Sequence, residues 1–401
     1  MTVIVVAANP PVLEQAVLDS GVQDVVSVVP QRIADTRAAV TYPVHVVPSL
    51  SDLPAVAAVA AAHPGATAVL ALQEEAMVAA GFLRDLLDVP GPRLGEAVRF
   101  TDKAVMKRRL DRAGLPVARH IRVRTLDEVA AAADRLGWPV VSKPVTGGAT
   151  QHVWRLTDRA ELDRLRGGGH LTGEGPFLVE EYVDVVQEYH CEALFARGAE
   201  VYAHVGRYPQ PLLHGLGDTN GTTFLPDDSH EAQTVAELHR SAARALGLTD
   251  GFTHGEFFGT RQGLLVGEVA ARPGGAGIPR ALQLQYGIDV RGWAIDLALD
   301  RPLRPAGPPS DGVVTWLALA ARPGRIARIS SAEELLAHDG VIEAVLRYQP
   351  GDVFDRPRAA TAYSGHVYLA SRRIADAAAD IAGLLARYRF EIEIEVDDAT
   401  H

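Results

Sequence analysis

The pattern of strands and helices predicts an α/β (α+β) protein that begins with an open parallel sheet and continues into a larger mixed region. Apolar strands alternate with helices over roughly the first 95 residues, which is typical of parallel sheets. Further along, a lysine lies inside an apolar strand just before a glycine loop, and two glutamates lie on paired apolar runs. Charges in such positions indicate a polar ligand site in the mixed region.

The first region consists of short buried strands and helices with apolar residues at helical spacing. Parallel strands end at one edge of the sheet, which could line a ligand crevice. No G-x-G-x-x-G follows the first strand, so a dinucleotide site of the Rossmann type is not supported. The predicted strands span 2–8, 24–30 and 67–72, and the predicted helices span 9–21, 55–62 and 73–87.

Composition argues against several classes of protein. The chain has 50 acidic and 39 basic residues, a net charge of −11 and no basic stripe, so we expect no nucleic-acid partner. The single cysteine, Cys191, rules out an internal disulfide and suits a reducing cytoplasm. The uncharged stretch from Leu53 to Gln73 is interrupted by His63-Pro64-Gly65, so we expect helix, turn and strand rather than a membrane span. No basic residue precedes the apolar start, so no signal peptide is expected.

A basic helix is predicted over 101–117, after a linker at 89–95. Thr101 or Asp102 can cap its start. Lys103 lies in the first turn, where the helix is already positive, so an anion bound there would explain it. A solvated surface lysine is the alternative.

Lys143 lies inside an apolar strand, where an unpaired ammonium group is costly. The loop after it carries Thr146, Gly147, Gly148 and Thr150, whose backbone N–H groups and hydroxyls can cradle a phosphate chain. Adjacent glycines also occur in ordinary hairpin turns. A strand lysine directly before the loop favours the phosphate interpretation.

Two acidic strands and a long loop follow a helix predicted over 125–137. The strand at 177–184 ends with Glu180 and Glu181, and the next strand places Glu188 and Glu192 on one face. The irregular segment at 207–229 precedes a helix at 231–247, and loops of this length are often functional. The alternative is a surface loop without a function, which would have a similar sequence. The polar residues of this loop are His214, Asp218 and Asn220.

The stretch 252–275 predicts a β-hairpin with one glutamate on each strand. A three-residue loop at 261–263, with Gly263 in a left-handed conformation, would place Glu256 opposite Glu268. The period of two then puts five residues on one face: His254, Glu256, Glu268, Ala270 and Arg272.

Two opposed carboxylates about 4 Å apart repel by roughly 4 kcal/mol at an effective dielectric of about 20. A divalent cation held together with substrate phosphates would remove that cost, which describes a Mg²⁺-nucleotide site. Arg272 would add a fixed fork for a phosphate or carboxylate. A two-residue turn is the alternative, and it would shift the register so that the two glutamates no longer face each other.

After the hairpin, the sequence predicts a helix, a break and a final segment, 312–396, in which no pattern indicates chemistry. A helix predicted over 278–300 has Arg280 in its first turn, and a proline-rich break follows at 302–309. The remainder, 312–396, alternates strands with helices and reads as the outer part of the preceding domain.

The order of five motifs resembles that of the ATP-grasp superfamily of carboxylate–amine ligases, in particular its peptide-forming, amino-acid-ligase group. The motifs read TDKAVMK, WPVVSKP followed by TGGATQ, LVEEYVD, THGEFF and VGEVAARPGG. The resemblance covers roughly residues 1–300. It implies an ATP-grasp fold with a pre-ATP-grasp domain at 1–98, a linker helix and lid subdomain at 99–184, and a C-terminal domain at 185–401 that carries the metal and substrate site.

The resemblance also implies how residues divide the work. The resemblance assigns contacts with the phosphates, adenine and ribose of ATP to Lys103, Lys143, Thr146, Gly147, Gly148, Thr150, Glu180, Glu181, Tyr182, Val183 and Glu188. Mg²⁺ falls to Glu256 and Glu268. Catalytic roles fall to Arg272, Lys143, Glu268 and Arg280. Substrate selection falls to His214, Asp218, Asn220, His254, Arg272, Gly274 and Gly275.

The implied reaction uses ATP and Mg²⁺ to join a small carboxylate to an amine through an acyl phosphate, with amino-acid-like substrates. One departure concerns the metal: many members carry asparagine where this chain has Ala270, so water and phosphate would complete the shell of a second ion. Two alternatives stay open, a bicarbonate- or formate-activating enzyme and a nucleotide-binding protein without ligase activity. We expect a cytoplasmic protein, and a homodimer by analogy with the fold.

Overall fold

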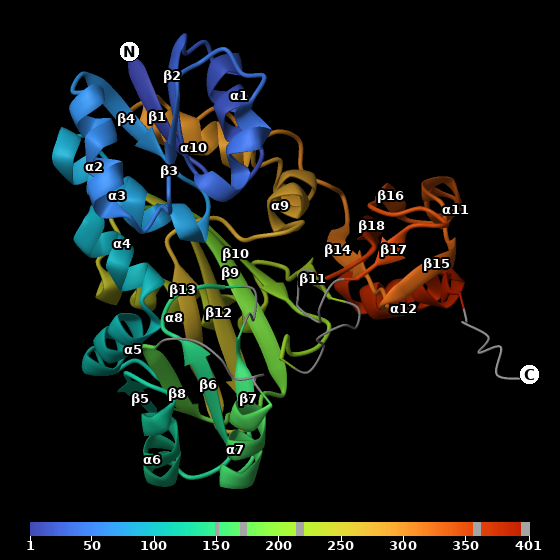
Figure 1. The fold of residues 1–401 in the computed structure, drawn as a ribbon. Helices are drawn as coiled ribbons and strands as arrows, with labels where there is room; N and C mark the ends of the chain where they lie inside the picture. Colours follow the sequence, from blue (N-terminus) through green and yellow to red (C-terminus); the bar gives the residue numbers. More distant parts are fainter. Residues whose placement is uncertain (149–151, 169–174, 214–219, 356–361, 394–401) are drawn as a thin grey trace, which may run out of the picture.

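The computed structural model describes residues 1–148, 152–168, 175–213, 220–355 and 362–393. Figure 1 shows the N-terminal sheet and the sheet that contains β5 to β8 at opposite ends of the molecule, with a large central sheet between them. The C-terminal strands lie at one side of the molecule, where β14, β18 and β16 extend the central sheet. No helix in these described ranges is both long and apolar enough to cross a membrane.

The N-terminal sheet is parallel, with strand order β3-β2-β1-β4, as the strand–helix alternation predicted. The sequence did not indicate its edge strand β3, where polar His45 and exposed Val46 break the apolar run. The strands are β1 (Thr2–Val6), β2 (Asp24–Pro30), β3 (Val44–Val47) and β4 (Ala66–Leu70).

Helices from two distant parts of the sequence cover this sheet. The core on one face joins Val3 and Val5 of β1 with Leu13 of α1 and Ile295 of α10, so a helix from residue 290 onward completes the N-terminal layer. The helices and 3₁₀ turns around the sheet are α1 (Val12–Asp19), α2 (Leu53–Ala62), α3 (Met77–Leu87), α10 (Val290–Ala298), η1 (Gln31–Arg37) and η2 (Glu74–Ala76).

The basic helix predicted at 101–117 is shorter than expected, and it follows α4 (Leu94–Thr101), a helix that the sequence did not indicate and that begins within the predicted linker at 89–95. It forms α5 (Lys103–Arg112), and the Asp102 side chain caps it by accepting the N–H groups of Ala104 and Val105. The antiparallel sheet after it has the order β5-β8-β6-β7. Its elements are β5 (His120–Val123), α6 (Asp127–Leu136), β6 (Val140–Pro144), β7 (Trp154–Leu156), α7 (Arg159–Gly167) and β8 (Phe177–Glu181).

The central sheet has eight strands in the order β13-β12-β9-β10-β11-β14-β18-β16. Its last three strands come from the C-terminal region, so this region extends the central sheet. The single helix predicted at 278–300 is two helices, because Gly287 takes a left-handed conformation (φ 73°) that ends α9. The elements are β9 (Gln187–Ala196), β10 (Ala199–Arg207), β11 (Gly221–Phe224), α8 (His230–Leu246), β12 (Gly251–Thr260), β13 (Gly263–Ala270), α9 (Ile278–Tyr286), β14 (Val313–Leu319), β16 (Val341–Leu346) and β18 (Gly365–Ser371). A small sheet and two helices complete the chain: β15 (Gly324–Ile329), β17 (Val353–Phe354), β19 (Phe390–Ile392), α11 (Ala332–Leu336) and α12 (Ile374–Arg387).

The β12–β13 hairpin corrects the predicted loop and keeps the predicted glutamate pair. Thr260 pairs with Gly263, so the turn has two residues rather than three. A bulge then inserts Gly267 between the partners of Phe257 and Glu256, and this extra residue restores Glu256 opposite Glu268. A side chain at Gly267 would come within 3.0 Å of the Glu256 carbonyl oxygen, so glycine suits this position.

Candidate active site

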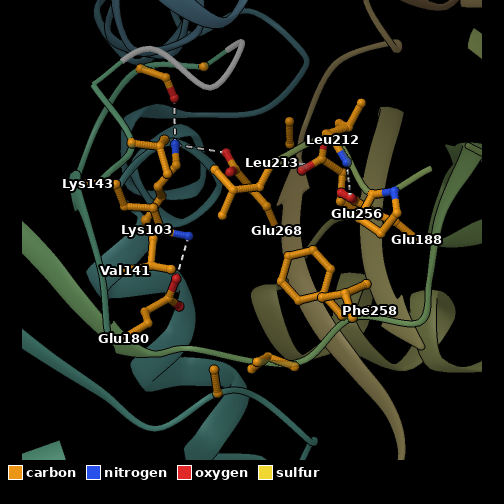
Figure 2. Close-up of a pocket in the computed structure, with 18 of the residues that line it drawn as sticks. Lys103, Val141, Lys143, Glu180, Glu188, Leu212, Leu213, Glu256, Phe258 and Glu268 are labelled. Carbon is orange, nitrogen blue, oxygen red and sulfur yellow. Dashed lines mark hydrogen bonds and ion pairs between the residues drawn. The ribbon is translucent and has the colours of Figure 1, made fainter. Parts of the chain in front are cut away.

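A pocket lies between the sheet of β6 and β8 and the central sheet, and six elements contribute to its lining: α5, β6, β8, β9, β12 and β13. Figure 2 shows Lys103, Lys143 and Glu180 on one side, Glu268 near the middle, and Glu188 on the opposite side. Residues from all five quoted motifs, spread over more than 150 positions, therefore meet at one place.

Lys143 is held by a buried carboxylate on the neighbouring strand. Its ammonium group lies 2.5 Å from Glu180 of β8, and Lys107 of α5 lies 3.0 Å from the other oxygen of Glu180. Lys107 also donates to the carbonyl oxygen of Val266. Burial would raise the pKa of Glu180, but the charges of the two lysines lower it to about 2. Glu180, predicted to contact the nucleotide, is therefore the counter-ion of two lysines.

Lys103 joins the glycine loop to the acidic hairpin. Its ammonium group lies 2.9 Å from Glu268 and donates to the carbonyl oxygen of Gly147. Thr146, Gly147 and Gly148 line the pocket as predicted. The first residue of α5 is thus aimed at the pocket and paired, which argues against a solvated surface lysine.

The rest of the pocket is lined mainly by apolar side chains, together with the residues that end β8. Glu181, Tyr182 and Val183, at the end of β8, which the resemblance assigned to the nucleotide, line this part of the pocket. Glu188 lies across from them and accepts the N–H of Leu212. Burial and the nearby charge of Glu256 raise the pKa of Glu188 to about 8. The sequence did not identify the apolar walls, which are Ala118, Val141, Val153, Val185, Leu212, Leu213 and Phe258.

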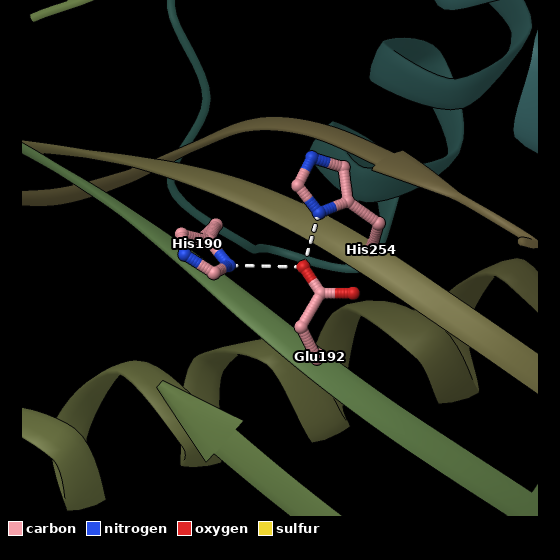
Figure 3. A group of neighbouring side chains, drawn as sticks. All are labelled: His190, Glu192 and His254. Carbon is pink, nitrogen blue, oxygen red and sulfur yellow. Dashed lines mark hydrogen bonds and ion pairs between the residues drawn. The ribbon is translucent and has the colours of Figure 1, made fainter. Parts of the chain in front are cut away.

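A buried network connects the hairpin to β9. His254 lines the pocket, its Nδ1 lies 2.5 Å from Glu192, and its Nε2 lies 3.5 Å from Glu256. His190 contacts the same Glu192 oxygen at 2.9 Å (Figure 3). Burial alone would lower the pKa of His254, but the charge of Glu192 and the hydrogen bonds to both glutamates raise it to about 10. The charge of His254 and the hydrogen bonds from His190 and His254 lower the pKa of Glu192 below its usual range, against the effect of burial.

Arg272 connects the pocket to the N-terminal region. Its Nε donates to Glu74 at 2.7 Å, and Nη1 donates to the carbonyl oxygen of Pro273. Glu74 follows β4, at the carboxyl edge of the parallel sheet. The charge of Glu74 and its hydrogen bond raise the pKa of Arg272 further, although burial would lower it.

Several predicted site residues lie elsewhere. Arg280 pairs with Glu343 of β16, because the first turn of α9 faces a strand that the sequence could not place beside it. Asn220 accepts the N–H of Ala318 with its carbonyl oxygen. Across the described parts of the chain, the pocket lining does not include Arg280, Asn220, Gly274 or Gly275. Thr150, His214 and Asp218 lie outside the described residues.

Three kinds of site residue were missed. Lys107 is the second lysine of the quoted TDKAVMK motif, and its spacing of four from Lys103 put both on one helix face. Glu74 directly follows a buried strand, where parallel sheets bind ligands. His190 gave no signal, because a histidine on an apolar strand is ordinary.

Comparison with known proteins agrees with this fold. Residues 108–280 match the family model of the ATP-grasp domain, and residues 316–393 match that of the L-amino acid ligase C-terminal domain 2. The L-arginine-specific L-amino acid ligase of Bacillus subtilis is 30% identical over 298 residues, which cover 73% of this chain and 72% of the relative.

Solved structures share the fold over nearly the whole chain. The L-amino acid ligase from Bacillus licheniformis superposes with a TM-score of 0.75 at 19% identity, covering 98% of this chain and 99% of that one. The N5-carboxyaminoimidazole ribonucleotide synthetase from Thermotoga maritima gives 0.70 at 18% identity, covering 98% of this chain and all of the other.

Fold, site and comparisons together define an ATP-grasp carboxylate–amine ligase, an ATP-dependent and ADP-forming enzyme that makes carbon–nitrogen bonds. Within that class the chain belongs to the L-amino acid ligase family.

Proposed function

We propose that this chain joins two amino-acid-like substrates by a peptide bond and uses Mg²⁺ with ATP. The relationship to an L-arginine-specific L-amino acid ligase supports the substrate class. The observation that carries the metal assignment is the opposed pair Glu256 and Glu268, because both carboxylates line the pocket beside Lys103. Carboxylate oxygens next to a phosphate-binding lysine fit Mg²⁺ held with ATP.

The residues of the chain would divide the reaction as follows. Lys103 and Lys143 hold phosphate oxygens of ATP, and Glu256 and Glu268 hold Mg²⁺. Mg²⁺, when bound, offsets charge on the transferred phosphoryl group. Arg272 orients the substrate carboxylate, one oxygen of which forms a bond to the γ-phosphorus while the bond to ADP breaks.

The second step is the attack of the amine on the acyl carbon. The C–N bond forms, the C–O bond to phosphate breaks, and the amine loses its proton. The apolar walls keep water away from the acyl phosphate, which water would hydrolyse. Glu188 accepts hydroxyl hydrogens of the ribose in this proposal.

The test is phosphate release with Mg-ATP across pairs of amino acids, with mass spectrometry of the products. We expect ADP, phosphate and a product whose mass equals both substrates minus water, and none of them in EDTA. Bicarbonate-dependent turnover without an amine, or ATP binding without turnover on any pair, would contradict peptide formation. The cytoplasmic location, the homodimer and the lack of nucleic-acid partners stay predictions. Light scattering of the purified protein tests the homodimer.

A further inference from the structure

Six side chains form two rows across three neighbouring strands on the pocket-facing side of the central sheet. The first row runs from His190 of β9 through Glu256 of β12 to Glu268 of β13. The second row is Glu192, His254 and Ala270. Five of the six positions carry a carboxylate or an imidazole, and Ala270 alone contributes no polar atom to this patch.

His254 lies beside the gap that the small side chain of Ala270 leaves. The two residues are direct partners in the hairpin, and His254 is 7% exposed. Its Nδ1 faces Glu192 at 2.5 Å, and its Nε2 faces Glu256 at 3.5 Å. The contact with Glu192 is a hydrogen bond, and the longer contact with Glu256 is an ion pair.

Glu192 fixes more than the histidine. Its Oε1 accepts from His254 and faces His190, and its Oε2 accepts the N–H of Gly274 at 2.8 Å. A side-chain carbon at Gly274 would lie 2.7 Å from Glu192, so the turn after Arg272 packs directly on this carboxylate. A carboxylate with all these partners holds the imidazole in one orientation.

The arrangement does not itself resemble a metal site. His190, Glu192 and His254 lie close enough to ligate an ion, but their nitrogen and oxygen atoms point at one another. The nitrogen of His254 that reaches the pocket side faces Glu256. The network therefore ends at a carboxylate that the proposed function assigns to Mg²⁺.

We propose that His254, oriented by Glu192, is a positioning residue for Glu256 and fixes this metal-binding carboxylate at the place where Ala270 supplies no polar group. The proposal rests on the Mg²⁺ assignment made above. It adds that the metal shell of this enzyme depends on a buried histidine that the metal does not touch.

The experiment measures Mn²⁺ binding by electron paramagnetic resonance in the presence of ADP, and ADP binding in EDTA by calorimetry. Mn²⁺ takes the same oxygen ligands as Mg²⁺. We expect His254→Gln to weaken Mn²⁺ binding about ten-fold, as loss of an orienting partner typically does. Metal-free ADP binding should change less than two-fold. Glu192→Gln, which keeps the side-chain shape, should act in the same direction.

His204→Gln is the matched control, because His204 also pairs with a carboxylate, that of Asp227, and does not line the pocket. Its Mn²⁺ affinity should equal that of the unmodified protein. Unchanged Mn²⁺ binding in both His254→Gln and Glu192→Gln would overturn the proposal, as would an equal loss of metal-free ADP binding. An unmodified enzyme that binds Mn²⁺ with ADP but makes no product would instead contradict the proposed reaction and leave this inference standing.

Discussion

Lys107 of α5 lies 3.0 Å from Glu180 of β8, and both side chains are buried. This pair connects α5, which carries Lys103, to β8, whose Glu180 also pairs with Lys143 of β6. Because Lys107 also donates to the Val266 carbonyl oxygen on β13, one side chain joins both sheets that enclose the pocket.

Replacement of Lys107 by methionine should destabilise the protein. Removing one partner from a buried ion pair leaves charge uncompensated, so we expect the free energy of unfolding to fall by about 3 kcal/mol. Urea unfolding followed by circular dichroism measures it. Arg108→Met, at an exposed position on the same helix, is the control and should change stability by less than about 0.5 kcal/mol. Equal losses in the two variants would show that the buried pair contributes nothing special.

Glu74→Gln should lower kcat about ten-fold and leave the KM for ATP nearly unchanged. The substitution removes the charge that orients Arg272, and charge-assisted hydrogen bonds contribute roughly 1.5–3 kcal/mol. Phosphate release at saturating amino acids measures kcat. Glu75→Gln is the matched control, because Glu75 is the next residue and pairs with Arg32 in solvent. A normal kcat in Glu74→Gln would mean that Arg272 does not depend on its hydrogen bond to Glu74 for its role in turnover.

Glu268→Gln should abolish turnover while the fold survives. The change keeps the side-chain size and removes a charged oxygen from the proposed metal site, so we expect a loss of at least about a hundred-fold in kcat. Phosphate release measures turnover, and a thermal unfolding curve shows whether the fold survives. Glu237→Gln, exposed on α8, should behave like the unmodified protein. An active Glu268→Gln enzyme would remove the metal assignment from this residue.

His239 should make the protein less stable in mild acid. Its ring is buried between α8 and β12 near Phe257, and neither nitrogen has a hydrogen-bond partner within the described structure. Burial lowers its pKa to about 4, against roughly 6.5 in the unfolded chain. The unfolded chain therefore takes up the proton first, so stability present above pH 6.5 is lost as the pH falls toward 4.

The resulting loss from pH 7 to pH 5 is about 2 kcal/mol for this one residue. We expect His239→Leu to reduce the drop in unfolding free energy between these pH values by that amount, as measured by urea unfolding at each pH. Replacement of His338, which is partly exposed, by leucine should leave the drop unchanged. The same pH dependence in His239→Leu as in the unmodified protein would show that His239 is not the group responsible.

The β12–β13 hairpin shows which structural features the sequence could predict and which it could not. Alternation and the apolar runs predicted both strands and the face shared by Glu256 and Glu268, and this face was confirmed. The predicted turn length was wrong, and a bulge at Gly267 compensated for the error. A bulge depends on the packing of Phe258 and the backbone around that glycine, and no local pattern encodes it.

Contacts between distant segments could not be predicted in the same way. Glu74 and Arg272 are 198 positions apart, and α10 completes the N-terminal layer from residue 290 onward. Arg280 met Glu343 of a C-terminal strand instead of the pocket. Such pairings depend on how whole sheets are placed, which single-sequence reasoning does not give.

The sequence by itself determined the parallel N-terminal sheet, the two pocket lysines, the glycine loop and one glutamate on each strand of the hairpin, because each follows from local spacing and composition. The direct opposition of the two glutamates depends on the bulge at Gly267. The tertiary structure alone decided which charges neutralise one another. Lys107 with Glu180 and Arg272 with Glu74 became partners only when separate sheets packed together, and His254 met Glu192 only when β12 paired with β9. Burial makes those pairings necessary, since an unpaired charge in that interior would cost several kcal/mol.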